Sequence, residues 1–307
     1  MNPENAFSST QEQIISWAER NGFSHWAVAM LWLVVALILF QVVAGIVVVG
    51  LIIASEGMAS AHELTELMME RVDLLFIGNS VGQILFIGLA TFLIVNLNRA
   101  GESKRQFLRL NWTEQSMRYI LFGAVLIVVV QPVVVYLGYL NSILPIPESF
   151  TDLQISQYEM IESFLTREGI LWFGLLNIAL IPAVCEEVLF RGYVLRAFEK
   201  SWGIITAIVV SGIIFGMFHI QLGNLLPLAT LGMILALMTW LSGSLWPAII
   251  AHFINNGAAV LVGIHFPELL FQDMTAEVLP PVWLLLLSIV LTVAIIHIMI
   301  NQSDHRK

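Results

Sequence analysis

The sequence predicts an all-α, polytopic membrane protein with about eight transmembrane helices. Of its 307 residues, 58% are hydrophobic and only 11% are charged, and the mean hydropathy is +0.87. About 25% of the residues of a typical soluble domain are charged, so this composition excludes a soluble globular enzyme. Apolar runs long enough to cross about 30 Å of hydrocarbon as helices recur along the whole chain.

Eight apolar runs account for the predicted helices. The first run, 26–54, is longer than the apolar region of a signal peptide, and no basic segment precedes it, so we interpret it as a transmembrane helix. The others follow at 73–97, 119–141, 169–190, 203–220, 225–241, 245–264 and 281–300. In the fifth run, Gly212 and Gly216 are four residues apart, a spacing that allows close approach of a neighbouring helix.

Charge sets the predicted orientation. Lysine and arginine gather in the loop 98–118, whereas 55–72 and 145–168 are acidic and each favour a short helix at the outer surface. The positive-inside rule then puts both termini in the cytoplasm, and we expect a bacterial or archaeal cell membrane as the location. The net charge of −9 gives no reason to expect a nucleic-acid partner.

The runs suggest four regions along the chain. These are a cytoplasmic N-terminal segment (1–25), an N-terminal transmembrane region with acidic outer loops (26–168), a core formed by the fourth to seventh helices (169–264), and an outer loop with the last helix and a cytoplasmic tail (265–307).

Three charged residues stand out in the fourth apolar run. Glu186, Glu187 and Arg191 follow the single cysteine, Cys185, which we interpret as a packing residue. A charge in hydrocarbon costs roughly 2.5–3.5 kcal/mol even on lenient scales, so such residues indicate function. Glu187 and Arg191 are i,i+4 neighbours that can pair on one helix face. Glu186 is rotated by about 100° and remains available for chemistry.

Two further polar motifs lie in later apolar runs. Phe215 and His219 are four residues apart in the fifth run, and His252 and Asn256 have the same spacing in the seventh. A helix face with an imidazole and an amide inside a membrane must meet a polar partner or water. We therefore interpret His219, His252 and Asn256 as candidate site residues, and Phe215 as a packing residue that shapes the cavity.

The three motifs, in this order, resemble the CAAX-protease and bacteriocin-processing (CPBP, or ABI) family of intramembrane endopeptidases. The resemblance covers roughly residues 170–260. It implies a four-helix catalytic core and a peptide or protein substrate, which is prenylated for some members. Nothing in this sequence selects a lipidated substrate.

By this resemblance, Glu186 is the general base and His219 lies beside the water. His252 and Asn256 form the oxyanion site, while Glu187, Arg191 and Phe215 have supporting roles. These residue types suit peptide hydrolysis, since a carboxylate can take a proton from water. Each well-placed donor can stabilise the developing oxyanion by roughly 3–4 kcal/mol.

A zinc-dependent peptidase is the closest alternative. Glu186, His219 and His252 could hold zinc with an open fourth position. However, the sequence contains no HExxH motif and the three residues come from three different helices. We therefore expect a metal-free mechanism without a cofactor.

Two other classes remain open: a non-catalytic membrane immunity or scaffold protein, and an ion-coupled transporter, which also uses buried charges. The helix ends place Glu186 and His252 toward the cytoplasmic half of the membrane and His219 toward the outer half. On this basis we expect a cytoplasm-facing cavity.

Overall fold

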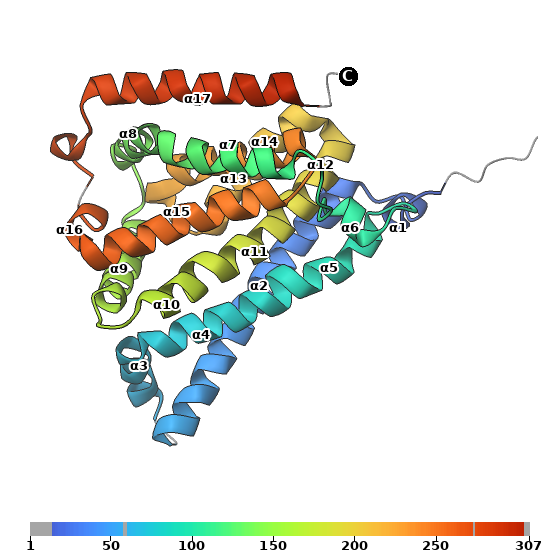
Figure 1. The fold of residues 1–307 in the computed structure, drawn as a ribbon. Helices are drawn as coiled ribbons and strands as arrows, with labels where there is room; N and C mark the ends of the chain where they lie inside the picture. Colours follow the sequence, from blue (N-terminus) through green and yellow to red (C-terminus); the bar gives the residue numbers. More distant parts are fainter. Residues whose placement is uncertain (1–13, 58–59, 273, 304–307) are drawn as a thin grey trace, which may run out of the picture.

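The structure is a computed structural model that describes residues 14–57, 60–272 and 274–303. These residues form helices and connecting turns, with no β-strand among them (Figure 1). The predicted all-α fold is confirmed. Most of the predicted N-terminal segment and the last four residues of the tail lie outside the described residues.

Six helical segments are long and apolar enough to cross a membrane within the described part of the chain. They are α2 (His25–Glu56); α4 (Val72–Gly82) continued by η1 (Gln83–Ala90), α5 (Thr91–Ile94) and η2 (Val95–Leu97); α10 (Leu171–Gly174) continued by η3 (Leu175–Leu180), α11 (Ile181–Glu187), η4 (Val188–Val194) and α12 (Leu195–Trp202); η5 (Leu222–Asn224) with α14 (Leu225–Ser242); α15 (Trp246–His265); and α17 (Val282–Gln302).

The other two predicted spans are helical but not simple membrane crossings. The third is divided into α7 (Ser116–Val129) and α8 (Gln131–Ser142), which meet at an angle of 46°. Pro132 explains the bend, because proline lacks the N–H that continues a helix. The fifth, α13 (Ile204–Phe218), has 15 residues and spans only about 22 Å at 1.5 Å per residue. The described residues therefore contain six or seven candidate spans and one shorter apolar helix, where the sequence predicted about eight spans.

Short helices occupy the two ends of the molecule (Figure 1). At one end lie α3 (Ala61–Glu70), α9 (Glu148–Leu165) and α16 (Pro267–Leu270), with η6 (Ala276–Val278) in the same connection. At the other lie α1 (Trp17–Arg20) and α6 (Lys104–Phe107), beside α12. Both acidic segments thus contain the short helix that the sequence predicted.

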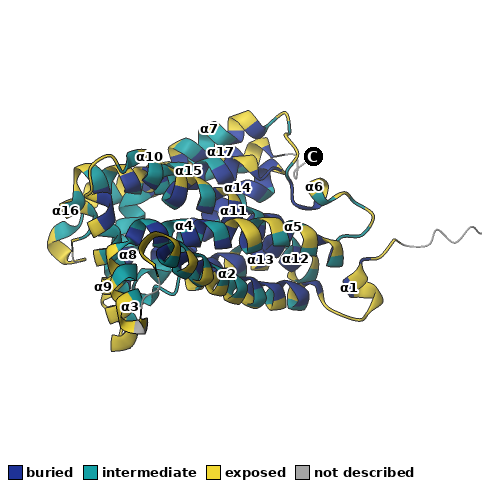
Figure 2. Cartoon of the chain, turned by 90° about the horizontal axis from the view of Figure 1, so that it is seen from below, coloured by how far each residue is buried: buried dark blue, intermediate teal, exposed yellow. Residues whose placement is uncertain are grey.

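Apolar side chains on the outside of the helices mark a surface that faces lipid. Leu31, Ile38, Val42 and Ile46 of α2 form an exposed apolar stripe, and α17 is largely exposed in the same way. Figure 2 shows exposed residues along the outer helices and buried residues on the central α11. Soluble proteins rarely expose apolar faces of this length. The protein is an integral, multi-pass membrane protein.

Glycine residues bring α13 and α14 into close contact, as the Gly212 and Gly216 spacing predicted. A β-carbon at Gly212 would lie 2.9 Å from the backbone nitrogen of Met233, and one at Gly232 would lie 3.0 Å from Gly212 itself. Side chains here would force the helices apart. The close contact also determines where the end of α13, with His219, lies in the molecule.

We predict that Gly212→Ala lowers the unfolding temperature in detergent, because the added methyl group meets backbone atoms of α14. Overpacking of this kind costs roughly 1–3 kcal/mol. Gly50→Ala in α2 is the matched control, since a β-carbon there meets no atom within 4 Å, and its unfolding temperature should stay the same or rise. Equal effects of the two substitutions would contradict the close helix contact.

Candidate active site

Glu186 and Glu187 lie in the middle of the long helix that runs from Leu171 to Trp202. Their turn, α11, is flanked by the π-helical segments η3 and η4, and Pro182 at its start cannot donate a hydrogen bond to the preceding turn. Insertions of π-helix often occur at functional sites. Both carboxylates are buried, with exposures of 8% for Glu186 and 0% for Glu187.

Glu187 is the centre of a buried ionic cluster. Its Oε1 accepts hydrogen bonds from Arg191 Nη1 at 2.6 Å and from His252 Nδ1 at 2.8 Å. Arg191, which is 1% exposed, also donates through Nη2 to the carbonyl of Gly232 on α14 at 3.2 Å. The predicted i,i+4 pairing is therefore present, and it joins α11 and η4 to α14 and α15.

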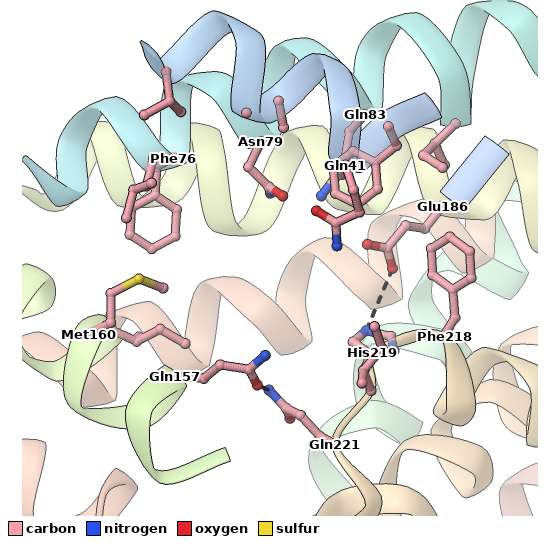
Figure 3. Close-up of a pocket in the computed structure, with 18 of the residues that line it drawn as sticks. Gln41, Phe76, Asn79, Gln83, Gln157, Met160, Glu186, Phe218, His219 and Gln221 are labelled. Atoms are coloured by element: carbon pink, nitrogen blue, oxygen red, sulfur yellow. Dashed lines mark hydrogen bonds and ion pairs between the residues drawn. The ribbon is translucent and has the colours of Figure 1, made fainter. Parts of the chain in front are cut away.

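Glu186 points away from this cluster, toward His219. Its Oε2 lies 3.9 Å from His219 Nε2 (Figure 3) and has no hydrogen-bond partner within the described part of the chain. The other ring nitrogen, His219 Nδ1, lies 2.8 Å from the carbonyl of Phe215. Because a carbonyl only accepts, Nδ1 carries the proton of a neutral ring and Nε2 is left as an acceptor. A separation of 3.9 Å is too long for a direct hydrogen bond but suits one bridging water.

His252 and Asn256 form the second part of the site. Asn256 Nδ2 lies 3.2 Å from His252 Nε2 and donates to the carbonyl of Ile178 at 3.2 Å. Both residues line a small cavity of about 40 Å³ that His219 also lines. His219 therefore lies between this cavity and the larger one that contains Glu186.

Phe215 packs among the polar groups. Its ring lies 4.8 Å from the His219 ring and 5.9 Å from the His252 ring. The guanidinium of Arg191 lies over its face at 4.2 Å, a favourable cation–π arrangement. Cys185, beside the carboxylates, is buried in the apolar core, with its Sγ next to Gly88. This location agrees with our interpretation of Cys185 as a packing residue.

The predicted difference in level between Glu186 and His219 was wrong, because one predicted helix end was wrong. The fourth apolar run was expected to end at residue 190, but the helix continues to Trp202, and this places Glu186 near its middle. His219 caps the short α13 and so reaches the same level.

The cavity at Glu186 has a volume of about 510 Å³. Met68 of α3 and Gln157, Met160 and Ile161 of α9 are among its lining residues. These helices lie at the end of the molecule away from α1, α6 and α12 (Figure 1). The cavity therefore lies toward the end of the molecule formed by α3 and α9, and the side of the membrane that it faces stays a prediction.

The backbone after His219 is strained and held by α9. Ile220 has φ of +57°, a left-handed conformation that costs a side chain of this type about 1–2 kcal/mol. The next residue, Gln221, donates to Gln157 Oε1 at 2.9 Å, and Asn224 donates to the hydroxyl of Tyr158 at 3.0 Å. Burial raises the pKa of Tyr158, so this hydroxyl stays neutral. Sequence reasoning missed this support, because no local pattern links α9 to residues more than 60 positions away.

The three candidate zinc ligands, Glu186, His219 and His252, are not gathered around one point in this arrangement. The described residues contain no group of three His, Cys, Asp or Glu side chains placed to hold one metal ion. His252 already faces Glu187 and Asn256 with its two ring nitrogens, whereas a zinc ligand needs a free one. The metal-free mechanism therefore stays a proposal, with the zinc mechanism as its alternative.

The middle of the chain matches a known protein family. Residues 168–258 match the family model of the Rce1-like type II CAAX prenyl endopeptidases. The match covers less than a third of the chain but contains all seven predicted site and supporting residues, and it confirms the resemblance to the CPBP family. No curated protein and no solved structure gives a significant match.

We predict that Ile220→Gly keeps or raises the unfolding temperature, because glycine adopts the left-handed conformation without strain. Ile213→Gly, within α13, should lower it, since glycine in a helix interior costs about 1 kcal/mol. Thermal unfolding in detergent compares the two variants. Equal losses would show that residue 220 is not held in a left-handed conformation.

Proposed function

We propose that this protein is an intramembrane endopeptidase of the CAAX-protease-like type, in which Glu186 activates water to hydrolyse a peptide bond. The Glu186 carboxylate carries the proposal. It is buried, its Oε2 has no hydrogen-bond partner among the described residues, and it faces His219 in a cavity of about 510 Å³. The family match over residues 168–258 supports a peptidase.

The two side chains would orient the attacking water. Glu186 and His219 Nε2 both accept hydrogen bonds, so a water between them donates one hydrogen to each. Its oxygen lone pair is then free to approach a substrate carbonyl. Holding the nucleophile in this geometry lowers the barrier, because its orientation is fixed before reaction.

We propose the following steps. The water oxygen bonds to the carbonyl carbon as its proton moves to Glu186, and the carbonyl electron pair moves to oxygen. Asn256 Nδ2 donates to this oxyanion in place of its contact with His252 Nε2, and His252 completes the oxyanion site. The carbon–nitrogen bond then breaks, and the leaving nitrogen takes the proton from Glu186.

The remaining residues have positioning roles in this proposal. Glu187 and Arg191 hold the turn so that Glu186 faces the cavity, and Glu187 also fixes the ring of His252. Phe215 packs between the two halves of the site. The proposed mechanism needs no metal or other cofactor.

The substrate in this proposal is a peptide segment of a membrane-associated protein, with a lipidated cysteine as one form to be tested. The proposed location is a bacterial or archaeal cell membrane with both termini in the cytoplasm. The basic residues near α1, α6 and α12 favour this orientation.

We predict that purified protein in detergent cleaves members of a fluorogenic peptide library, offered with and without a farnesyl group. Glu186→Gln and His219→Ala should each lower the rate by roughly 10²–10⁴-fold, the usual contribution of a general base. Treatment with a zinc chelator should leave the wild-type rate unchanged.

Other outcomes would replace the proposal. Activity lost to the chelator and restored by zinc would establish the metal mechanism. Cleavage that is unaffected by both substitutions would exclude this site. A biological activity that Glu186→Gln retains would indicate an immunity or scaffold protein, and substrate accumulation in vesicles would indicate a transporter.

A further inference from the structure

The large cavity is lined by an unusual number of amide side chains. Gln41, Asn79 and Gln83 lie on one wall, contributed by α2, α4 and η1, and Gln157 and Gln221 lie on the opposite wall (Figure 3). Gln221 donates a hydrogen bond to Gln157 on that opposite wall. Gln41, Asn79 and Gln83 have no such partner among the described residues, and they converge on the cavity.

Gln41 is the only amide or charged side chain between residues 27 and 54. Polar groups in the middle of a membrane helix are costly and mark function. Gln41 makes no side-chain hydrogen bond within the described part of the chain, and its amide points into the cavity (Figure 3). Gln41 is exposed, so its amide is open to a ligand in the cavity.

Asn79 and Gln83 lie one turn apart on the neighbouring helix. Gln83 is only 6% exposed, yet its Oε1 has no hydrogen-bond partner among the described residues. Asn79 likewise has no side-chain hydrogen bond there. A buried, unpaired amide oxygen costs about 1–3 kcal/mol, and this cost applies to Gln83. Asn79 is half-buried and Gln41 is exposed, so their amides are open to the cavity.

Amides elsewhere within the helices are satisfied, which makes the cavity amides distinctive. Asn177 accepts from Ser80 at 2.7 Å and donates to the carbonyl of Phe173 at 2.9 Å. Gln131 donates to the carbonyl of Ile127 at 2.7 Å and to Asn255 Oδ1 at 3.1 Å. Among the described amide side chains, Gln83 of the cavity wall is the one with a buried, unpaired oxygen.

The spacing and chemistry of these amides match a peptide main chain. Each amide offers both a donor and an acceptor, as a peptide group does. Residues one helical turn apart are separated by roughly 6 Å along the axis, and every second residue of an extended chain by roughly 6.6 Å.

We propose that Gln41, Asn79 and Gln83 form a subsite that hydrogen-bonds the main chain of an extended peptide substrate. The peptide runs between Glu186 with His219 at one end of the cavity and Phe76 with Met160 at the other, where an apolar substituent packs (Figure 3). Recognition through the main chain makes the subsite tolerant of substrate sequence. This inference rests on the proposed peptidase function.

The test measures binding rather than cleavage, so the two proposals can fail separately. The protein carries Glu186→Gln, and the probe is the peptide of the fluorogenic library that binds it most tightly. A series of this peptide has one main-chain amide at a time replaced by an ester, which removes an N–H donor and weakens the carbonyl acceptor.

We predict that at least two esters weaken binding about five-fold, the loss expected for one hydrogen bond. Each leucine variant (Gln41→Leu, Asn79→Leu or Gln83→Leu) lacks one cavity amide. In that variant, the ester that replaces the peptide group bonded by the lost amide should weaken binding less than about two-fold. Met68→Leu alters another cavity residue without an amide and should keep the full ester effect. Where a leucine variant does not fold, the methionine variant at that position replaces it.

Equal ester effects in the parent and all three variants would overturn the subsite, as would the absence of any ester effect or of any peptide binding. In those cases the peptidase proposal would still stand if the wild-type protein cleaves peptides and Glu186→Gln does not. Peptide binding with the predicted ester pattern, but without wild-type cleavage, would support the subsite and reject the peptidase.

Discussion

The buried pairing of Glu187 with Arg191 and His252 is the constraint on which the rest of the site depends. Glu187 is fully buried, and an uncompensated charge at such a position would be strongly destabilising. Its Oε1 meets this requirement with one donor from the next helical turn and one from α15. Satisfying the charge therefore fixes both the rotation of α11 and its contact with α15.

That rotation separates the roles of two adjacent carboxylates. With Glu187 directed into the cluster, Glu186 turns toward the cavity, where His219 lies 3.9 Å away. His219 reaches this level because α13 is short and packs against α14 through Gly212. One ionic cluster and one close helix contact thus assemble groups from three helices.

Much of this arrangement could be predicted from the sequence because its signals are local. The i,i+4 spacing of Glu187 and Arg191 determines their pairing wherever the segment is helical, and hydropathy identifies apolar helices directly. The order of the three polar motifs along the chain is specific enough to indicate the family by itself.

The errors arise where local patterns do not determine geometry. Hydropathy ended the fourth helix near residue 190, since the amphipathic segment that follows contains charged residues, although the backbone stays helical to Trp202. The bend between α7 and α8 had a signal in Pro132, but its size depends on packing. The link between Gln157 and Gln221 joins distant segments, and the unpaired state of Gln83 appears only once its neighbours are placed.

The most direct test of this account compares the unfolding temperatures of Glu186→Gln and Glu187→Gln in the same detergent. We expect Glu187→Gln to lose stability, by roughly 3–5 kcal/mol, because Arg191 is left buried without its counter-charge. Glu186→Gln should unfold at the wild-type temperature or above it, since the Glu186 side chain makes no hydrogen bond in the described structure. Glu187 holds Arg191 and His252 through Oε1, although its own Oε2 also lacks a partner there. Equal losses, or a larger loss in Glu186→Gln, would contradict the division of roles between the two glutamates.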